Sequence, residues 1–450
     1  MNGWRKMRKR IVGISIYIMA VLSLAACTQP AQTVPQDETA ARPLTAAVEA
    51  GLHETENGTG AELLEISNIM QEEEEQEEDG SGYGLLTGAA AEQLSEEQND
   101  LIMNYMDCYF RSVADLRVSE ELAGLFLEPE GLQAEMNKNG LEYLIGIRSM
   151  QQTDLSLAGF YYELTIEEVN ILEDGSIEVT GEEWNRQNFS RHPEVDSEQY
   201  GIRHRFVLVQ QDGEWKIREH LQRDGIYWHL FGEYWGQAVE DIPDAENYFQ
   251  ENLESLLTEA EEQLETWNAG TNTEIPQFDH AYDREQAVLY ADEWIGTRNG
   301  EWADYTGRGG NCQNYASQCL LAGGIPMDRE GSAVWKWYGE DLDNGSSAAG
   351  RSSSWTGVDE FWQYAAQNEG FGLAAAVDCP FDTGEAGDLI RMGFPENWNH
   401  VVIITDVVMD EAGETVDYLI DSNTSDMKNF PASAYPLPCR SLIKIYGWNE

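Results

Sequence analysis

The sequence contains few basic residues, few histidines and few cysteines, and each scarcity excludes a class of function. Of its 450 residues, 27 are Lys or Arg and 82 are Asp or Glu, which gives a net charge of −55 at pH 7. This balance excludes nucleic acid as a partner, because phosphate binding needs clustered cations. Seven histidines, six cysteines and the lack of a Cys-X-X-Cys or His-Glu-X-X-His motif exclude a zinc site. Phosphate-loop and dinucleotide fingerprints are also absent, so we predict no cofactor.

The N-terminus lacks an apolar run long enough to span a bilayer. The run from Ile11 to Leu24 has about fourteen residues, against roughly 17–25 for a spanning helix. It follows the basic segment Arg5 to Arg10 and ends in LAAC at residues 24–27, which has the form of a lipobox. We therefore predict a lipoprotein signal peptide at 1–26, lipid on Cys27 and an extracytoplasmic location, anchored to the membrane by that lipid. An uncleaved anchor is the alternative. Removal of residues 1–26 would leave a net charge of −60.

Residues 27–97 lack sustained apolar periodicity and include an acidic run at 72–79, so we predict a disordered acidic tether. The segment 98–235 begins with helical spacing and continues with alternating strands, which predicts an α+β domain. The strands are expected at 159–166, 176–180, 203–210 and 214–217. This order resembles the cone-shaped nuclear-transport-factor-2-like fold. Residues 236–275 are expected to form an acidic helical connector, with an amphipathic helix from Ala245 to Trp267.

One cysteine stands where a glycine-rich turn gives way to a helix. The segment Gly309 to Cys319 reads GGNCQNYASQC, which places Cys312 at the helix start. The unsatisfied N–H groups of a helix N-terminus favour a thiolate, so we expect a lowered thiol pKa. Cys312 and Cys319 are separated by a rise of about 10 Å along that helix, too far for a disulfide. Cys379 and Cys439 could pair, although nothing in the sequence requires it.

A nucleophilic cysteine needs a base, and one histidine follows Cys312. This is His400, at the start of the apolar run 400–405, which predicts a buried strand. Further strands are expected at 386–392 and 416–423, the latter antiparallel to the His400 strand. A helix bearing Cys, followed by a sheet bearing His, is the papain-like order. We therefore predict an α+β chain whose C-terminal domain, 276–450, is papain-like.

Six sequence blocks make this domain resemble a known family. They read YDRE at 282–285, GGNCQNYASQCL at 309–320, AGGIPM at 322–327, SSSWTG at 352–357, GDLI at 387–390 and KNFP at 428–431. Residues from about 279 to 446 thereby resemble the family called "Putative amidase domain", among the NlpC-like, papain-related cysteine peptidases. The resemblance implies Cys312 as nucleophile, His400 as general base and then acid, and a third polar residue on the following strand.

The third residue and its surroundings depart from the family pattern. Alignment of Thr424-Ser425-Asp426 with the family's downstream signature places the third residue at Asn423, where relatives often carry His; Asp421 or Ser422 could replace it. Asn311 stands where the family usually has Asp. Asp304 and Tyr305 are candidates for lining the site. Six aromatic residues of this domain could stack on sugars or peptides, although core packing is the expected role for most of them: Trp335, Trp337, Tyr338, Trp355, Trp362 and Trp398.

These observations predict a lipid-anchored cysteine amidase or peptidase that hydrolyses amide bonds through an acyl-enzyme. The lipobox favours peptidoglycan or a peptide as substrate, with the middle domain as spacer or binding module. The alternative is a non-enzymatic binding or sensor lipoprotein with a decayed papain-like domain. An acyl transferase that uses the same thioester is a third reading. The sequence does not indicate the scissile bond or an oligomeric state.

Overall fold

The computed structural model describes residues 82–264, 270–330 and 333–450. Residues 79–450 form one compact unit. The predicted signal peptide, Cys27 and most of the predicted tether lie outside the described residues. Within the described ranges, no helix is long and apolar enough to cross a membrane.

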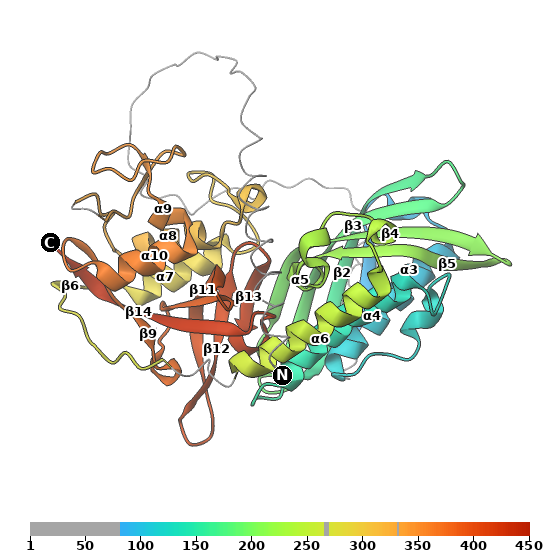
Figure 1. Ribbon diagram of the computed structural model, residues 1–450, viewed down its shortest axis with the longest axis horizontal. Coiled ribbons are helices and arrows are strands. Elements are labelled where there is room, and N and C mark those ends of the chain that lie inside the picture. The colour runs from blue at the N-terminus through green and yellow to red at the C-terminus, as the bar shows by residue number, and fades with distance from the viewer. Residues whose placement is uncertain (1–81, 265–269, 331–332) are drawn as a thin grey trace, which may run out of the picture. The chain divides into compact units, whose positions relative to one another are not determined.

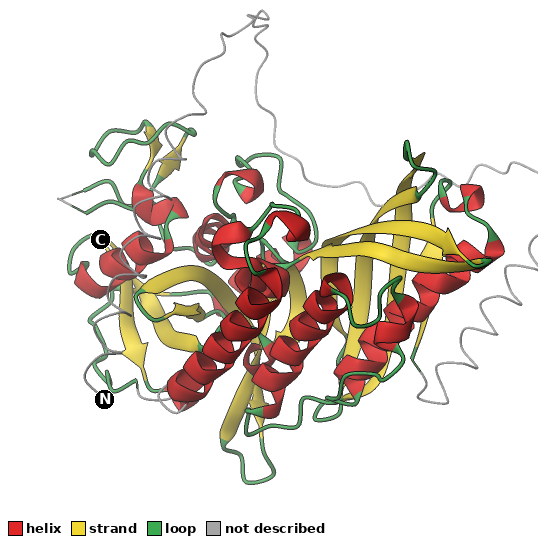
Figure 2. Ribbon diagram, turned by 45° about the vertical axis from the view of Figure 1, so that its right-hand side comes forward, coloured by secondary structure: helices red, strands yellow, loops and turns green. Residues whose placement is uncertain are grey.

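The first half of the described chain is a strongly curved sheet covered by helices (Figure 1). Its strands follow the order β1-β2-β3-β4-β5, with β1 parallel to β2 and all other pairs antiparallel. The strands are β1 (Tyr83–Thr87), β2 (Leu157–Ile171), β3 (Ile177–Phe189), β4 (Ser197–Gln211) and β5 (Glu214–Arg223). The helices are α3 (Glu96–Ala114), α4 (Leu132–Ser149), α5 (Gly225–Phe231) and α6 (Ala245–Leu264). Figure 2 shows α4 and α6 side by side over the strands.

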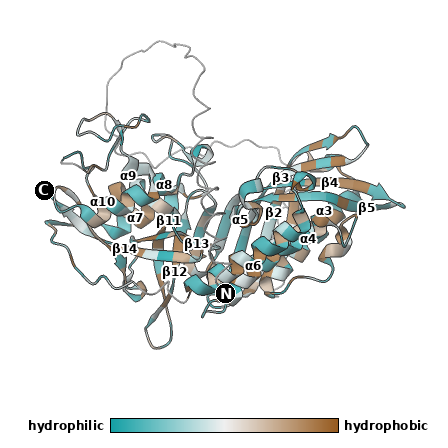
Figure 3. Ribbon diagram, in the orientation of Figure 1, coloured by the Kyte–Doolittle hydropathy of each residue, from teal (hydrophilic) through white to brown (hydrophobic). Residues whose placement is uncertain are grey.

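The helix ends and the burial pattern follow from the sequence. Ser95 caps α3 in a reciprocal box, in which its side chain accepts from the Gln98 N–H and the Gln98 side chain accepts from the Ser95 N–H. The helices present alternating hydrophilic and hydrophobic stripes in Figure 3, and the buried face of α6 includes Phe249 and Leu253. The four predicted middle strands and the connector helix are present, and the strands extend beyond their expected ends.

The predicted tether ends earlier than residue 97. Strand β1 (Tyr83–Thr87) pairs with β2, and α3 begins at Glu96. Sequence periodicity missed β1 because it is short and its side chains are only partly buried, so it shows no strict alternation. Part of the range predicted as a tether, from residue 82 to 97, is therefore structured.

The second half pairs a long antiparallel sheet with helices. The order is β13-β12-β11-β10-β14-β6, and β9 also pairs with β14. The strands are β6 (His280–Ala281), β9 (Gly372–Cys379), β10 (Leu389–Phe394), β11 (Asn397–Met409), β12 (Thr415–Ser422), β13 (Asp426–Pro431) and β14 (Cys439–Asn449). A small separate hairpin consists of β7 (Trp337–Tyr338) and β8 (Gly350–Arg351). The helices are α7 (Arg284–Trp294), α8 (Cys312–Ala322), α9 (Ser353–Thr356) and α10 (Val358–Gln367). As predicted, β12 is antiparallel to β11.

The two halves share one sheet. Strand β13 pairs with β4, with Asp426 opposite Tyr200 and Lys428 opposite Glu198. The Ser197 hydroxyl donates to the Asn429 carbonyl oxygen at 2.8 Å, one residue beyond this short ladder. Strand β13 therefore pairs with the first sheet at β4, and the loop before it and the segment after it carry residues of the candidate site.

Candidate active site

Cys312 is the first residue of α8, and two glycines place it there. Gly309 has φ 109° and Gly310 has φ 113°, a backbone conformation that residues with a Cβ rarely adopt. The Asn311 N–H then donates to the Thr424 hydroxyl, at 2.5 Å, and ties the turn to the loop before β13. The helix starts as the sequence predicted, and the Cys312 side chain is buried.

The Cys312 sulfur lies against the backbone on both sides of His400. Its thiol donates to the Asn399 carbonyl oxygen at 3.9 Å. Burial raises the pKa of the Cys312 thiol, while the N–H groups of Val401, Gln313 and Cys312 itself act in the opposite direction. The helix N-terminus thus contributes as expected, but the expected net lowering of the pKa is wrong, because desolvation of the thiolate outweighs it.

His400 lies inside strand β11 rather than at its start, and two hydroxyl groups bind one of its ring nitrogens. Nε2 is 2.8 Å from the Ser422 Oγ and 2.8 Å from the Tyr435 Oη. The Tyr435 ring also stacks on the imidazole, with centroids 5.0 Å apart. Burial lowers the pKa of His400 to about 3, so the ring is neutral at pH 7. Among the described residues, no group, Cys312 Sγ included, is hydrogen-bonded to Nδ1.

Asn423, the predicted third residue, bonds elsewhere. Its Oδ1 accepts from Asn311 Nδ2 at 2.7 Å, and its own Nδ2 is buried without a partner among the described residues. The two positions that depart from the family pattern therefore contact each other. Of the two alternatives, Ser422 is the residue whose side chain is hydrogen-bonded to His400. Asp421 instead accepts from the Asn429 N–H, and burial raises its pKa to about 7.

Asp304 and Tyr305 support the turn that precedes Cys312. Asp304 Oδ1 accepts from the Thr306 N–H and hydroxyl, at 2.8 and 2.6 Å. The Tyr305 N–H donates to Asn311 Oδ1 at 3.1 Å. Among the described residues, neither side chain is hydrogen-bonded to His400, and the contacts of both residues hold the loop that precedes Cys312.

Of the six noted aromatic residues, two are buried in the core, Trp337 and Trp362 pack partly buried against it, and Tyr338 is exposed. Trp335 and Trp355 are fully buried, with ring centroids 4.7 Å apart. Their indole N–H groups donate to Ser317 and Asn314 on α8, at 3.1 and 2.9 Å. They therefore hold the helix that carries the cysteine.

Sequence reasoning missed Tyr435. It lies after the short 3₁₀ helix at Ala432–Ala434, in a segment without strand or helix periodicity. Only the return of the chain from β13 to β14 brings its hydroxyl to His400, so no local pattern could have identified it.

The other cysteines among the described residues form no disulfide. Cys108, Cys319, Cys379 and Cys439 are all buried free thiols, so the possible pair between Cys379 and Cys439 is not formed. In the described part of the chain, no group of three or more His, Cys, Asp or Glu side chains could hold a metal ion.

Comparison with known proteins supports an amidase-like C-terminal domain. Residues 281–446 match the family described as "Putative amidase domain". The chain is 27% identical over 213 residues to the "Uncharacterized protein YhbB" of Bacillus subtilis (strain 168). That similarity covers 46% of this chain and 60% of the relative's length. No solved structure matches the chain. The C-terminal domain is thus similar to a family of domains that suggests hydrolysis of amide bonds.

Proposed function

We propose that the C-terminal domain is a cysteine amidase or peptidase that hydrolyses an amide through a thioester at Cys312. The observation that supports it best is the position of the Cys312 sulfur, at a helix start and beside the backbone of His400, whose Nδ1 has no hydrogen-bond partner among the described residues. With hydrogen on Nε2, the oxygens of Ser422 and Tyr435 accept from the ring and leave the Nδ1 lone pair available as a base.

The reaction then follows in balanced steps. His400 takes the thiol proton as sulfur attacks the amide carbonyl carbon, and the backbone N–H at the helix start stabilises the oxyanion. The C–N bond breaks as the imidazolium gives its proton to the leaving amine. Water, deprotonated by His400, attacks the thioester; the C–S bond breaks, and the acid product and the thiol form. Because the resting thiol and imidazole are both neutral, the proton moves during attack rather than before it.

We further propose that residues 276–450 have a papain-like, NlpC-like fold and that the first domain has a nuclear-transport-factor-2-like fold. The Cys helix followed by an antiparallel sheet supports the former. The helices followed by a curved sheet that closes on β5 support the latter.

The proposed substrate is peptidoglycan or a peptide derived from it, and the enzyme is tethered by lipid on Cys27. This part rests on the LAAC sequence at residues 24–27, which would place the domain outside the membrane. Mass spectrometry of the protein should find lipid on Cys27, and Cys27→Ala should remove it from the membrane fraction. An unmodified Cys27 in the wild type would contradict the tether.

The amidase is tested by digestion of purified wall peptides. We expect the wild type to release new amine and carboxyl ends, and Cys312→Ala to release none. Cys319→Ala is the matched control, because it removes a buried thiol from the same helix and has no assigned role in the chemistry. Equal digestion by the wild type and Cys312→Ala would contradict the mechanism.

One observation favours a second candidate, the non-enzymatic binding or sensor protein. The thiol is buried and uncharged, and its neighbour Asn311 forms a neutral pair with Asn423. Binding of wall peptides without release of new chain ends would support this candidate over the amidase.

A further inference from the structure

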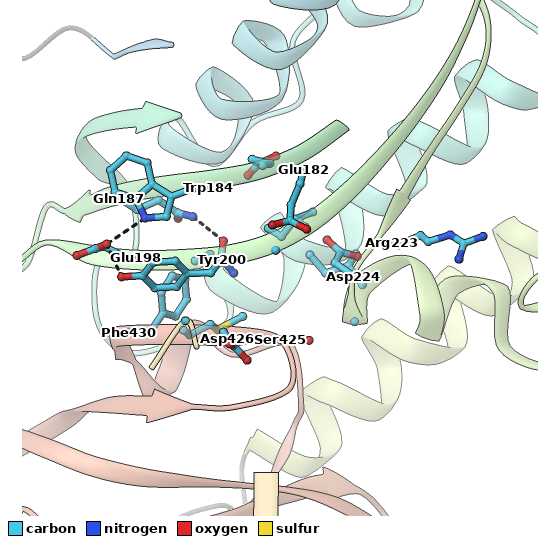
Figure 4. A pocket seen from close by; sticks show the side chains of 18 of the residues that line it. Glu182, Trp184, Gln187, Glu198, Tyr200, Arg223, Asp224, Ser425, Asp426 and Phe430 are labelled. Atoms are coloured by element: carbon cyan, nitrogen blue, oxygen red, sulfur yellow. Dashed lines mark hydrogen bonds between the residues drawn. The ribbon is translucent and has the colours of Figure 1, made fainter. Parts of the chain in front are cut away.

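A cavity of about 820 Å³ lies where β3 and β4 of the first sheet meet β13 and the segments on either side of it (Figure 4). This volume falls within the range of about 300–1,000 Å³ typical of small-ligand sites. Its lining includes Tyr435, whose hydroxyl bonds His400. An occupant of the cavity therefore lies one side chain from the proposed catalytic base.

The buried face of β3 supplies polar residues to this cavity where a core would have apolar ones. Asn185 donates to Glu183 at 2.6 Å, and Gln187 donates to Asn185 at 3.0 Å. Glu183 and Gln187 line the cavity and are buried, with 1% and 3% of their surface exposed. A chain of buried polar groups is costly unless its hydrogen bonds are satisfied. The polar lining of the cavity therefore favours a polar occupant.

The charge of the lining is strongly negative. Seven carboxylate side chains line the cavity, against three arginines. Within the described ranges, no cationic side chain lies within ion-pair distance of Glu163, Glu167 or Glu198. These uncompensated charges favour a cationic group in the occupant.

Glu198 is the carboxylate best placed to receive such a group. The Trp184 Nε1 donates to its Oε2 at 3.0 Å, and the Tyr200 hydroxyl donates to the same oxygen at 2.5 Å. Figure 4 shows the two aromatic side chains on either side of this carboxylate. A fixed carboxylate flanked by aromatic rings suits an ammonium ion, which gains both a charge-assisted hydrogen bond and cation–π attraction.

A second, independent observation concerns Arg148. Its side chain lines the cavity and is 2% exposed, and it donates through Nη2 to Gln187 at 3.0 Å. Its Nε and Nη1 have no hydrogen-bond partner among the described residues. Buried N–H donors without a partner are costly, so the Arg148 guanidinium favours a bound hydrogen-bond acceptor, such as a carboxylate or a peptide carbonyl oxygen.

We propose that this cavity binds a peptide with a free primary amine, the ammonium at Glu198 between Trp184 and Tyr200, and a carboxylate or carbonyl oxygen at Arg148. The role of this cavity as a substrate subsite depends on the proposed amidase activity. With this subsite, the amidase would cleave peptides that have an uncapped amine near the cleaved bond.

The test is calorimetric binding to the full chain carrying Cys312→Ala, which prevents turnover. The probes are the tripeptide Ala-Lys-Ala with a blocked N-terminus and the same peptide acetylated on the lysine amine. We expect the free-amine peptide to bind at least about tenfold more tightly, and Glu198→Gln to remove that preference. Glu168→Gln, on the exposed face of β2 and outside the cavity, should leave it intact.

Equal affinity for the two peptides, or a preference that survives Glu198→Gln, would overturn the inference. Cleavage by the wild type tells the two proposals apart. Cleavage of both peptides at equal rates keeps the amidase and overturns the subsite. If the free-amine peptide binds selectively but the wild type cleaves neither peptide, the amine site is supported and the amidase is contradicted.

Discussion

Buried imidazole groups lie in both halves of the described chain, a pair in the first half and His400 in the second, and they differ in their hydrogen bonds. In the first half, His204 Nδ1 is 3.1 Å from His220 Nε2, and His204 Nε2 is 2.7 Å from Glu183. The remaining nitrogen of His220 is 2.6 Å from Asn137 Oδ1. Every ring nitrogen of this pair is therefore engaged. In the second half, His400 keeps Nδ1 without a partner among the described residues, and the Cys312 thiol lies beside its backbone.

The comparison shows that burial alone does not mark a catalytic histidine. Burial lowers the pKa of both His220 and His400, in the former well below its ordinary value. What separates them is that His400 Nδ1 has no hydrogen-bond partner among the described residues, and that the Cys312 thiol, the proposed nucleophile, lies beside the His400 backbone. The His204–His220 pair builds the interior of the first domain, whereas His400 can accept a proton.

Loss of His400 should have the largest effect on turnover. We expect His400→Ala to lower kcat by about 10²–10⁴, the usual contribution of a general base. His220→Ala, also a buried change, should leave kcat per folded molecule near the wild-type value, because it removes partners of His204 and Asn137 in the interior of the first half and none of His400. Peptide cleavage rates, normalised to folded protein by circular dichroism, check both. Similar losses of kcat in His400→Ala and His220→Ala would contradict the distinction between the two buried histidines.

Acid should destabilise the protein partly through His400. Its pKa is about 3 when folded and about 6.5 when unfolded, so the unfolded chain binds more protons between these values. The stability from the neutral ring is complete above pH 6.5 and is lost as pH falls toward 3. Between pH 7 and pH 4 this loss is about 3 kcal/mol. The side chain of His400→Asn cannot titrate. Its free energy of unfolding, measured in urea, should therefore fall by about 3 kcal/mol less than that of the wild type between pH 7 and pH 4. Equal losses would contradict the burial of the imidazole.

Loss of the hydroxyl groups that bond His400 should lower turnover less than loss of His400 itself. Ser422→Ala removes one acceptor from Nε2, and we expect kcat to fall about five- to tenfold with KM unchanged, since one hydrogen bond is worth about 1 kcal/mol. Adding Tyr435→Phe should cost less than the product of the single losses if both groups hold the same nitrogen. A change confined to thermal stability would assign these residues a structural role only.

Asn423 should have the smallest effect on turnover. Asn423→Ala leaves Asn311 Nδ2 buried without an acceptor, which should cost about 1–3 kcal/mol of stability. We expect kcat to change by less than for Ser422→Ala. Thermal unfolding and steady-state kinetics measure the two quantities separately. A kcat loss larger than that of Ser422→Ala would return the orienting role to Asn423.

The sequence predicted the α+β class, the helix at Cys312 and the strand of His400, because glycine turns and apolar runs are local signals. It could not rank Asp421, Ser422 and Asn423, because adjacent strand residues face opposite sides and a one-residue change in register reassigns them. The position of Tyr435 depends on the return of the chain from β13 to β14. The cavity depends on the pairing of β13 with β4, a contact between segments more than two hundred residues apart. The thiol pKa was misjudged because the sequence indicates the helix start but not the burial.

Mass spectrometry of the protein quenched in acid during peptide cleavage tests the central claim most directly. We predict an acyl group bound as a thioester on Cys312 in the wild type, a slower rise of that species in His400→Ala and none in Cys312→Ala. Cleavage with no acyl group on Cys312, or an acyl group carried by another residue, would contradict it.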